Sequence, residues 1–390
     1  MYILLISRGI PSKNFPQWGC FEKDQAEALA AIGHKVIVMS VDARFKKKRG
    51  SLGLHHFNKN GVEYYNYIVL PGNLFIKTIG MDKYIKWIKF PMYFEKVFKR
   101  IVKDHGIPDI IYTQFYWNTV MGVKLKELTG IPVVGIEHWS RFNEPQLSEQ
   151  EFKWASYAFE KTDTNIAVAK TLAENLQKKF NTNFEVIYNM FGKEFEDDYI
   201  IPQYDNSHPI RFISVGSLIK RKGFDSLIEA FSKSNLPSSL WSLGIIGGGE
   251  EEANLHNLIK RKGLDNNIKL LGEMDKVSIV EELKKSNIFV LPSRNENFSV
   301  AILEGLALGL PVLATDCGGI RECLTEENGI IVPVDDIKSI SNGIKYMVAN
   351  YFIYDRDRIR VNARKRFSPK AIATQLTEFF NTILNPKSGV

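Results

Sequence analysis

Residues 291–305 read LPSRNENFSVAILEG and carry more information about the fold than any other stretch. An apolar run ends at Leu291, a polar loop with Glu296 follows, and apolar residues at helical spacing begin near Ser299. A strand that passes through a short polar loop into a helix is the repeating unit of parallel α/β sheets. The stretch therefore predicts one such unit, with its loop at the carboxyl end of a strand.

The same unit recurs along the chain, because short β-rich apolar runs alternate with helical patterns in both halves. The runs in the first half are residues 3–6, 36–39, 110–112, 133–136, 165–167 and 186–188, and those in the second half are 211–215, 243–246, 268–271, 288–291, 312–314 and 330–332. We therefore expect an α/β protein with two doubly wound, Rossmann-like domains. Ligands of open α/β sheets bind beyond the carboxyl ends of the strands, so we expect a cleft between the domains to hold the site.

A polar, proline-bearing stretch at residues 197–209 has no periodicity and is the expected linker. It divides the chain into a first domain of residues 1–200 and a second of residues 201–367. Helical spacing resumes in a last segment at about residues 368–386.

The composition is that of a folded globular protein. The chain has 390 residues, of which 44% are hydrophobic and 24% charged, which excludes collagen-like and wholly disordered chains. The three cysteines, Cys20, Cys317 and Cys323, are too few and too scattered for a disulfide framework or a thiolate zinc site, so we expect a reducing cytoplasm. No apolar stretch approaches about 18 residues, and no membrane span is expected.

Positive charge is concentrated in one part of the chain. The net charge is +7, and residues 44–103 hold 14 Lys or Arg against three acids, which indicates an anionic surface as partner. The helical pattern at residues 83–103 places Phe94, Val97 and Phe98 on one face. Such a helix could lie on an anionic bilayer, or it could dock its apolar face on the sheet with its lysines in solvent. Nucleic acid is not expected, since no recognised binding motif accompanies the charge.

Two acids in the decisive stretch, Glu296 and Glu304, are eight residues apart. They do not suit the pair of a glycosidase, whose carboxyls flank one bond, because one lies before the helix and the other inside it. They suit different hydroxyls of one extended ligand, and the amides of the first helical turn, at residues 298–300, favour an anion such as a diphosphate. A nucleotide sugar fits all three features. The alternative is a capping acid followed by a solvent-facing helix acid.

Two glycine turns follow other predicted strands. Gly216 ends the run 211–215, and the three cations at 220–222 could pair with phosphate oxygens, or could form a solvated loop. Glycines 247–249 end the run 243–246 and would permit close approach to a ligand. Neither a GxGxxG nor a GxxxxGK[ST] motif is present, which disfavours nicotinamide enzymes and P-loop kinases.

Taken in order, these motifs resemble the donor domain of the retaining glycosyltransferases of family 4, which have the GT-B fold. The motifs are the Gly216 turn with Lys222-Gly223, the glycines 247–249, the acids Glu296 and Glu304, and the segment CGGIRE at 317–322. The first half resembles the same family in its first loop and helix, in Glu137-His138 and in residues 186–189. The match covers nearly the whole chain.

The resemblance implies a role for each matching residue. Glu304 would hold the ribose of the donor and Glu296 the hydroxyls of the transferred sugar. Lys222 would neutralise the diphosphate leaving group, while Gly19 would let the first loop approach the phosphates and His138 would line the sugar pocket. The other expected donor contacts are Phe298, Ser299 and Val300 through their backbone, and Gly216, Ser217, Arg221 and Gly248.

The chain departs from the family at two positions. Ser217 stands where the family often has Arg, and Cys20 stands where it often has the second glycine of a pair. Lys220 or Arg221 is the expected substitute for the Arg. The family retains anomeric configuration without a metal, and we expect the one DxD match, at residues 355–357, to lie on a solvated surface.

The sequence thus predicts a retaining, metal-independent transfer of a sugar from a nucleotide sugar to a saccharide or lipid-linked saccharide. The expected setting is cell-surface polysaccharide synthesis in the cytoplasm or at the inner face of the membrane. By resemblance, the last helical segment would cross back to the first domain. Two alternatives remain, namely a non-catalytic nucleotide-sugar-binding subunit of a membrane-surface assembly and a GT-B nucleotide-sugar epimerase.

Overall fold

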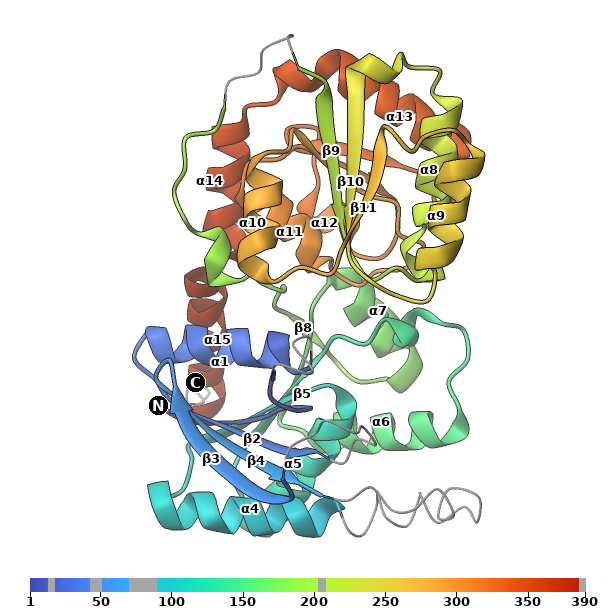
Figure 1. Cartoon of the computed structure of the whole chain (residues 1–390). Helices are drawn as coiled ribbons and strands as arrows, with labels where there is room; N and C mark the ends of the chain where they lie inside the picture. Colours follow the sequence, from blue (N-terminus) through green and yellow to red (C-terminus); the bar gives the residue numbers. More distant parts are fainter. Residues whose placement is uncertain (13–17, 43–50, 70–89, 203–207, 386–390) are drawn as a thin grey trace, which may run out of the picture. The chain divides into compact units, whose positions relative to one another are not determined.

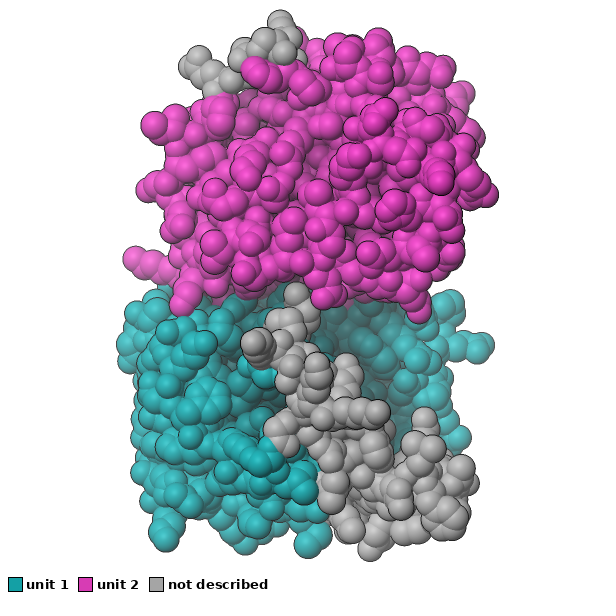
Figure 2. All heavy atoms as spheres, in the orientation of Figure 1, with its two compact units in different colours: residues 1–168, 173–187, 372–390 teal, residues 169–172, 188–371 magenta. Residues whose placement is uncertain are grey.

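The computed structural model describes residues 1–12, 18–42, 51–69, 90–202 and 208–385. The chain forms two compact units, coloured separately in Figure 2. Unit 1 comprises residues 1–168, 173–187 and 372–390, and unit 2 comprises residues 169–172 and 188–371. Each unit is described by itself.

Unit 1 is built on an eight-stranded sheet in the order β3-β4-β2-β1-β5-β6-β7-β8. Its strands pair in parallel except for the antiparallel hairpin of β3 and β4. Helices α1 and α4 pack on β2 and β4 from opposite faces (Figure 1). The strands are β1 Tyr2–Ile6, β2 Lys35–Asp42, β3 Gly53–Lys59, β4 Val62–Ile68, β5 Ile110–Gln114, β6 Val133–Glu137, β7 Thr164–Ala167 and β8 Glu185–Val186. The helices are α1 Cys20–Ala31, α4 Phe90–His105, α5 Tyr116–Thr129, η2 Ser140–Asn143, α6 Glu149–Lys161, α7 Lys170–Phe180 and α15 Pro369–Leu384.

Unit 2 is built on a six-stranded, wholly parallel sheet in the order β11-β10-β9-β12-β13-β14, with helices on its faces (Figure 1). The strands are β9 Ile210–Val215, β10 Trp241–Ile246, β11 Ile268–Gly272, β12 Ile288–Leu291, β13 Val312–Thr315 and β14 Gly329–Val332. The helices are η3 Lys193–Phe195, η4 Lys220–Lys222, α8 Phe224–Lys233, η5 Ser238–Leu240, α9 Glu252–Arg261, α10 Lys276–Lys284, α11 Val300–Ala307, α12 Ile320–Cys323, α13 Ile337–Asn350, η6 Tyr351–Ile353 and α14 Arg356–Phe367.

The central strands are mostly apolar because helices cover both faces of each sheet, and their polar residues lie near their carboxyl ends. Every residue of β1, β5, β6, β12 and β13 is buried, so these strands show apolar runs in place of alternation. The expectation of two doubly wound α/β domains is confirmed. In each sheet the first strand has the next strands of the chain on one side and a later strand on the other. The order of strands therefore reverses between β1 and β5 in unit 1 and between β9 and β12 in unit 2, and we call each of these places a switch point.

The chain enters unit 2 after residue 187, earlier than the expected boundary at 200/201. The residues that follow pack on unit 2. The Tyr188 ring stacks on that of Phe298 with centroids 4.7 Å apart, and the Tyr199 hydroxyl donates to the Leu308 carbonyl at 2.7 Å. Residues 197–202 therefore belong to unit 2 and do not link the units, and residues 203–207 lie outside the described part.

The end of the chain returns to unit 1. Helix α15 starts at Pro369, and the residues from 372 onward belong to unit 1. The Phe380 ring lies against that of Tyr112, with centroids 5.1 Å apart, and Thr377 Oγ1 lies 2.7 Å from His34 Nε2. These contacts attach the last helix to the turn between α1 and β2 and to β5.

Helix α4 decides between the two interpretations of the basic segment. Its residues Phe94, Val97, Phe98 and Ile101 are buried, and the helix packs on β2 and β4. The apolar face is therefore covered by the sheet, and the cations remain outside. The expected basic runs at 46–49 and 83–89 lie outside the described residues. None of the described helices combines the length and the apolarity that crossing a membrane requires.

Phe212, at the centre of β9, is fully buried and its ring lies 5.1 Å from that of Phe231. We expect Phe212→Ala to lower the free energy of unfolding by about 3–5 kcal/mol, because it leaves a cavity in a close-packed core. Phe352→Ala is the matched control, since that side chain is 68% exposed and its loss should cost less than about 0.5 kcal/mol. Urea denaturation followed by circular dichroism measures both, and equal costs would contradict the assignment of β9 to the core.

Candidate functional site

The switch point of unit 2 brings two predicted site residues into contact. Lys222 ends η4, in the loop that follows β9, and Glu296 lies in the loop that follows β12. Lys222 Nζ lies 2.5 Å from Glu296 Oε1, and the two side chains are only 13% and 10% exposed. The two residues are 74 positions apart in sequence, so the strand order, which places β9 beside β12, is what joins them. The pair presents both signs of charge at the edge where ligands of such sheets bind.

The loop that carries Glu296 is held by neighbours on both sides. Ser293 Oγ donates to Glu296 Oε1 at 2.8 Å, and the amide of Gly319 donates to the carbonyl of Asn297 at 2.7 Å. Cys317 is buried nearby, and burial, followed by the Glu296 charge, raises the pKa of its thiol to about 11. This thiol is therefore a packing group. The sequence had assigned no role to Ser293.

The three cations of η4 point to different partners. Arg221 Nη1 donates to the carbonyl of Asn295 at 2.9 Å and lies 3.9 Å from Glu296 Oε2. Lys220, in contrast, pairs with Glu251 at 2.9 Å. Arg221 and Lys222 thus face the Glu296 loop, and Lys220 faces the start of α9.

Arg294 fixes the position of η4 and was missed in the sequence. Its backbone amide donates to the Arg221 carbonyl at 2.8 Å, and its guanidinium donates to the Lys220 carbonyl, to Asp225 Oδ1 at 2.9 Å and to Asp335 Oδ2 at 2.8 Å. The guanidinium holds the pKa of Asp335 below its usual value. No sequence signal could identify these partners, because they lie in η4, in the first turn of α8 and after β14, all distant from Arg294 in sequence.

The start of α11 follows the same loop. Phe298 and Ser299 are each 4% exposed, and Val300 is half-buried. The Phe298 ring packs on Tyr188, and its carbonyl accepts from Asn189 Nδ2 at 2.9 Å. Within the described part of the chain, the amides of residues 298–300 donate to no protein acceptor. The side chain of Phe298 therefore packs within the unit, whereas the backbone keeps donors at a helix start.

Glu304 lies on α11 itself, in its second turn, and is 8% exposed. A residue so enclosed does not belong to a solvent-facing helix surface. The alternative of a solvated helix acid is therefore not what the structure contains at this position.

The glycines after β10 contact protein backbone. A Cβ on Gly247, whose φ is 146°, would lie 1.9 Å from the carbonyl oxygen of Gly216. The amide of Leu218 donates to the carbonyl of Gly248 at 2.9 Å, and Ser217 lies between these contacts, exposed. The absence of a side chain at Gly247 thus lets the loops after β9 and β10 touch each other, and contact of Gly216 and Gly248 with a donor stays a prediction.

Unit 1 carries the remaining two predicted residues at its own switch point. Gly19 precedes α1 with φ 78°, and a Cβ there would lie 2.0 Å from the carbonyl oxygen of Gly9. Trp18 Nε1 donates to the Arg8 carbonyl at 2.9 Å. The described part of the first loop is thus folded back on the end of β1, and residues 13–17 lie outside the described part.

Arg8 connects this loop to the strand beside it. Arg8 Nε donates to Glu22 Oε1 at 2.6 Å, and its Cζ lies 3.8 Å from the centre of the Phe115 ring. That ring lies 5.0 Å from the ring of His138, which follows β6. Gly19 and His138 therefore belong to the same edge of the unit 1 sheet, whereas the other predicted residues belong to unit 2. Arg8 and Glu22 had been given no role from the sequence.

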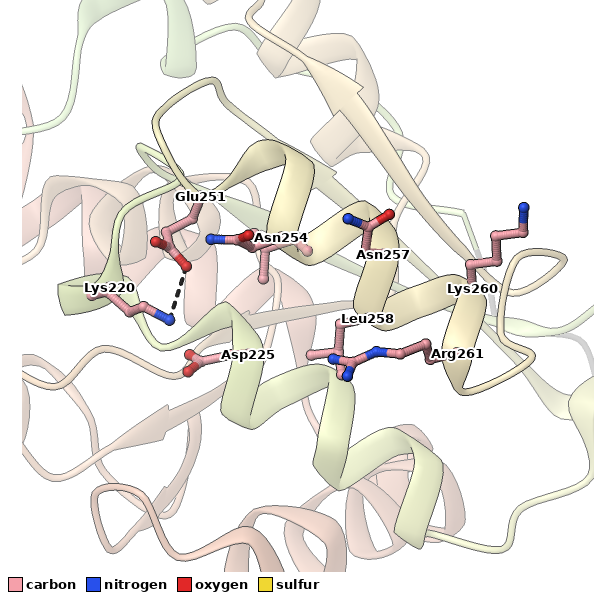
Figure 3. A pocket seen from close by; sticks show the side chains of 9 residues that line it. Lys220, Asp225, Glu251, Asn254, Asn257, Leu258, Lys260 and Arg261 are labelled. Carbon is pink, nitrogen blue, oxygen red and sulfur yellow. Dashed lines mark ion pairs between the residues drawn. The ribbon is translucent and has the colours of Figure 1, made fainter.

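A separate pocket of about 770 Å³ lies between α8 and α9 (Figure 3). The ion pair of Lys220 and Glu251 crosses one end of it. Neither Lys222 nor Glu296 lines it, so this pocket is distinct from the switch-point site. The residues that line it are Lys220, Asp225, Glu251, Asn254, Leu255, Asn257, Leu258, Lys260 and Arg261.

The DxD match has local partners. Asp355 caps α14 by accepting from the amide of Arg358 at 2.9 Å, and Asp357 pairs with Arg360 at 2.6 Å. Among the residues that the structure describes, no three His, Cys, Asp or Glu side chains are grouped so as to hold a metal ion.

Two protein-family models match the chain. The model of the glycosyl transferases group 1 matches residues 198–366, and that of glycosyltransferase family 4 matches residues 23–191. The first match contains the site of unit 2, and the second contains Phe115 and His138 of unit 1.

Curated relatives agree with these models. An uncharacterized glycosyltransferase of Haemophilus influenzae is 27% identical over 53% of the chain, a match that spans 63% of that relative's length. Another, of Methanocaldococcus jannaschii, is 27% identical over 88% of the chain and 87% of its own length. The lipopolysaccharide core biosynthesis glycosyltransferase LpsE of Rhizobium meliloti is 34% identical over 35% of the chain and 39% of its own length.

Solved structures show the same fold. Sucrose-phosphate synthase of Thermosynechococcus elongatus aligns over 99% of both chains with a TM-score of 0.76 and 19% identity. HepE of Anabaena, solved in complex with UDP-glucose, aligns over 97% of this chain and 99% of its own with a TM-score of 0.71 and 18% identity. The expected GT-B fold is confirmed.

The burial of Cys317 generates a prediction about its reactivity. Burial raises the pKa of Cys317 to about 11 and that of Cys323 to about 12, so at pH 8 both thiols are protonated and enclosed. Because the thiolate is the nucleophile, we expect iodoacetamide to label half-buried Cys20 and to leave the other two unlabelled until the protein unfolds. Peptide mass spectrometry measures the labelling, and rapid modification of Cys317 in the folded protein would contradict its placement.

Proposed function

Because this chain belongs to the glycosyltransferases of group 1 and family 4, we propose that it moves a sugar from a nucleotide sugar to a saccharide or lipid-linked saccharide. We propose further that the transfer retains anomeric configuration and needs no metal. The observation that carries the proposal is the contact of Lys222 with Glu296 at the switch point of unit 2, next to the donor amides of residues 298–300.

The chemistry of the donor explains why a cation and an acid stand together. Breaking a sugar–diphosphate bond builds negative charge on the diphosphate and positive charge on the anomeric carbon. Lys222 and the helix-start amides would stabilise the diphosphate, while Glu296 would accept hydrogen bonds from hydroxyls of the sugar. The 2.5 Å separation of Nζ and Oε1 means that a ligand joining phosphate to sugar would contact both groups. Glu304 would bind the ribose.

Arg221 is the better substitute for the Arg that Ser217 replaces. Its guanidinium lies beside the Glu296 loop, whereas the Lys220 side chain is engaged by Glu251 and is 68% exposed. An exposed ion pair contributes little, and its cation points away from the site. We therefore assign the second phosphate contact to Arg221.

The relatives support a role in polysaccharide synthesis. LpsE of Rhizobium meliloti is named for lipopolysaccharide core biosynthesis, and AmsK of Erwinia amylovora for amylovoran biosynthesis. The solved complexes of HepE contain UDP and UDP-glucose. We propose an acceptor of the same class, a cell-surface saccharide under construction, and UDP-glucose as the first donor to test.

Mutation of Lys222 and of Lys220 tests whether the cation beside Glu296 contributes to transfer. With UDP-glucose as donor, we expect Lys222→Ala to lower kcat about 100-fold or more, because a fixed cation at a leaving group contributes on the order of 3 kcal/mol to the transition state. Lys220→Ala, two positions away, is the matched control and should retain activity within about twofold. Release of UDP measures both. Equal losses in the two variants would remove Lys222 from its proposed role.

Mutation of Glu296 separates the enzyme from its alternatives. A transferase releases UDP in the presence of an acceptor saccharide and loses this turnover in Glu296→Ala, whose sugar contact is gone. A non-catalytic subunit would bind donor, seen as a raised Tm, with no turnover across a broad acceptor panel. An epimerase would yield an epimerised donor without acceptor, which chromatography of the nucleotide sugar detects.

A further inference from the structure

The carboxyl group of Glu137 joins two loops at the edge of the unit 1 sheet. Glu137 ends β6 and is 1% exposed. Its Oε1 accepts from the amides of His138 at 2.8 Å and Trp139 at 2.7 Å, and its Oε2 accepts from the amide of Tyr116 at 2.8 Å. One enclosed side chain thus satisfies three backbone donors, two in the loop after β6 and one at the first residue of α5.

Phe115 directly precedes Tyr116, whose amide donates to Glu137, and its ring contacts that of His138, whose amide also donates to Glu137. Its φ of 66° and ψ of 140° are outside the regions that a residue with a side chain prefers, so the conformation persists only because its surroundings fix it. The Phe115 amide donates to the Ile136 carbonyl at 2.9 Å, and the next amide, that of Tyr116, donates to Glu137. The ring is thereby held between the Arg8 guanidinium and the ring of His138.

Building on the proposed function, we propose that Glu137 is a positioning residue whose carboxylate holds Phe115 and His138 in the arrangement that admits the donor sugar. It does not touch the substrate. It acts through the backbone of the two loops, and the predicted sugar contact of His138 depends on this arrangement. Protonation of Glu137 weakens this hold and lowers the rate of transfer.

Protonation weakens these contacts because it reduces the number of acceptor oxygens that the Glu137 side chain offers. A carboxylate offers two acceptor oxygens, one toward each loop, whereas a carboxylic acid carries a proton on one of them. That O–H would face an N–H of the backbone, and a donor facing a donor leaves a buried amide unpaired. A glutamine has the same defect at every pH, since its NH₂ group replaces one of the oxygens.

The ionisation falls in an accessible range of pH. Burial raises the pKa of Glu137 to about 7, although the three backbone hydrogen bonds and the Arg8 charge act in the opposite direction. The other charged and titratable groups around it are Tyr116 on α5, whose pKa burial raises well above its usual range, His138 in its own loop, and Glu22 on α1, which pairs with Arg8. His138 also carries an ionisable side chain, so the test must separate its contribution from that of Glu137.

The test compares pH profiles of kcat with UDP-glucose as donor. We expect the wild-type kcat to rise by about tenfold from pH 6 to pH 8, as for one essential group with a pKa of about 7. Glu137→Gln should be slow and should lose this rise, while His138→Gln should be slower overall but keep it. Glu160→Gln, the same change at an exposed position of α6, should match the wild type. A rise that persists in Glu137→Gln, or one lost only in His138→Gln, overturns the proposal.

A second measurement does not depend on turnover. Hydrogen exchange, read by mass spectrometry at one pH on peptides spanning residues 114–118 and 136–140 and corrected for intrinsic rates, should show protection of these amides in the wild type. In Glu137→Gln the protection should be lower, because the glutamine leaves one of the three amides unpaired. If the wild type does not turn over UDP-glucose, the proposed function fails for that donor while exchange still tests the Glu137 contacts. Unchanged exchange in the variant, or changed exchange with unchanged activity, overturns the positioning role.

Thermal unfolding excludes simple loss of the fold. The pKa of Glu137 is raised on folding, so its contribution to stability is present below the unfolded pKa and is lost as pH rises through about 7. The Tm of the wild type should therefore fall relative to that of Glu137→Gln between pH 5 and pH 8. If Glu137→Gln is slow and its Tm instead falls relative to that of the wild type between pH 5 and pH 8, its loss of activity results from unfolding.

Discussion

The ion pair of Lys222 and Glu296 is the constraint on which the arrangement of the loops after β9 and β12 depends. Two opposite charges, each nearly enclosed, lose most of their hydration, and this cost is recovered only with short distances and additional hydrogen bonds. The surroundings supply both, since Ser293 donates to the carboxylate and Arg294 fixes the backbone of η4. A charged pair that requires so much support indicates a site maintained for chemistry, because apolar residues would stabilise the same loops at lower cost.

Both units use the parallel sheet in the same manner. Loops that follow neighbouring strands lie side by side at the carboxyl edge of the sheet, and residues distant in sequence meet there although no local sequence pattern marks them. In unit 1, Phe115 follows β5 at the switch point and meets Glu137 and His138 at the end of the neighbouring β6, whereas in unit 2 Lys222 and Glu296 face each other across the switch point itself. In each unit a buried carboxylate receives donors from the protein, but the one in unit 1 binds backbone and the one in unit 2 binds a cation.

Local sequence was sufficient for the elements and for residues whose role follows from their place after a strand. The apolar runs predicted the described strands except β3 and β4, and the loops after β9 and β12 were identified as carriers of Lys222 and Glu296. The partners of Arg294 and the donors to Glu137 could not be predicted, because they depend on which loops the strand order makes adjacent. The unit boundary was placed too late for a related reason: Tyr188 and Tyr199 pack within unit 2 through contacts that polarity and proline content do not reveal.

The return of α15 to unit 1 bears on synthesis of the protein. A ribosome releases Tyr112 long before Phe380, which packs against it, so the first unit emerges lacking its last helix. Unit 2 lies between these segments in the chain and is fully emerged once α14 has left the exit tunnel. During translation the second sheet is therefore able to close before the first is complete, and a nascent chain stalled before α15 would expose the apolar surface that Ile372, Leu376 and Phe380 later cover.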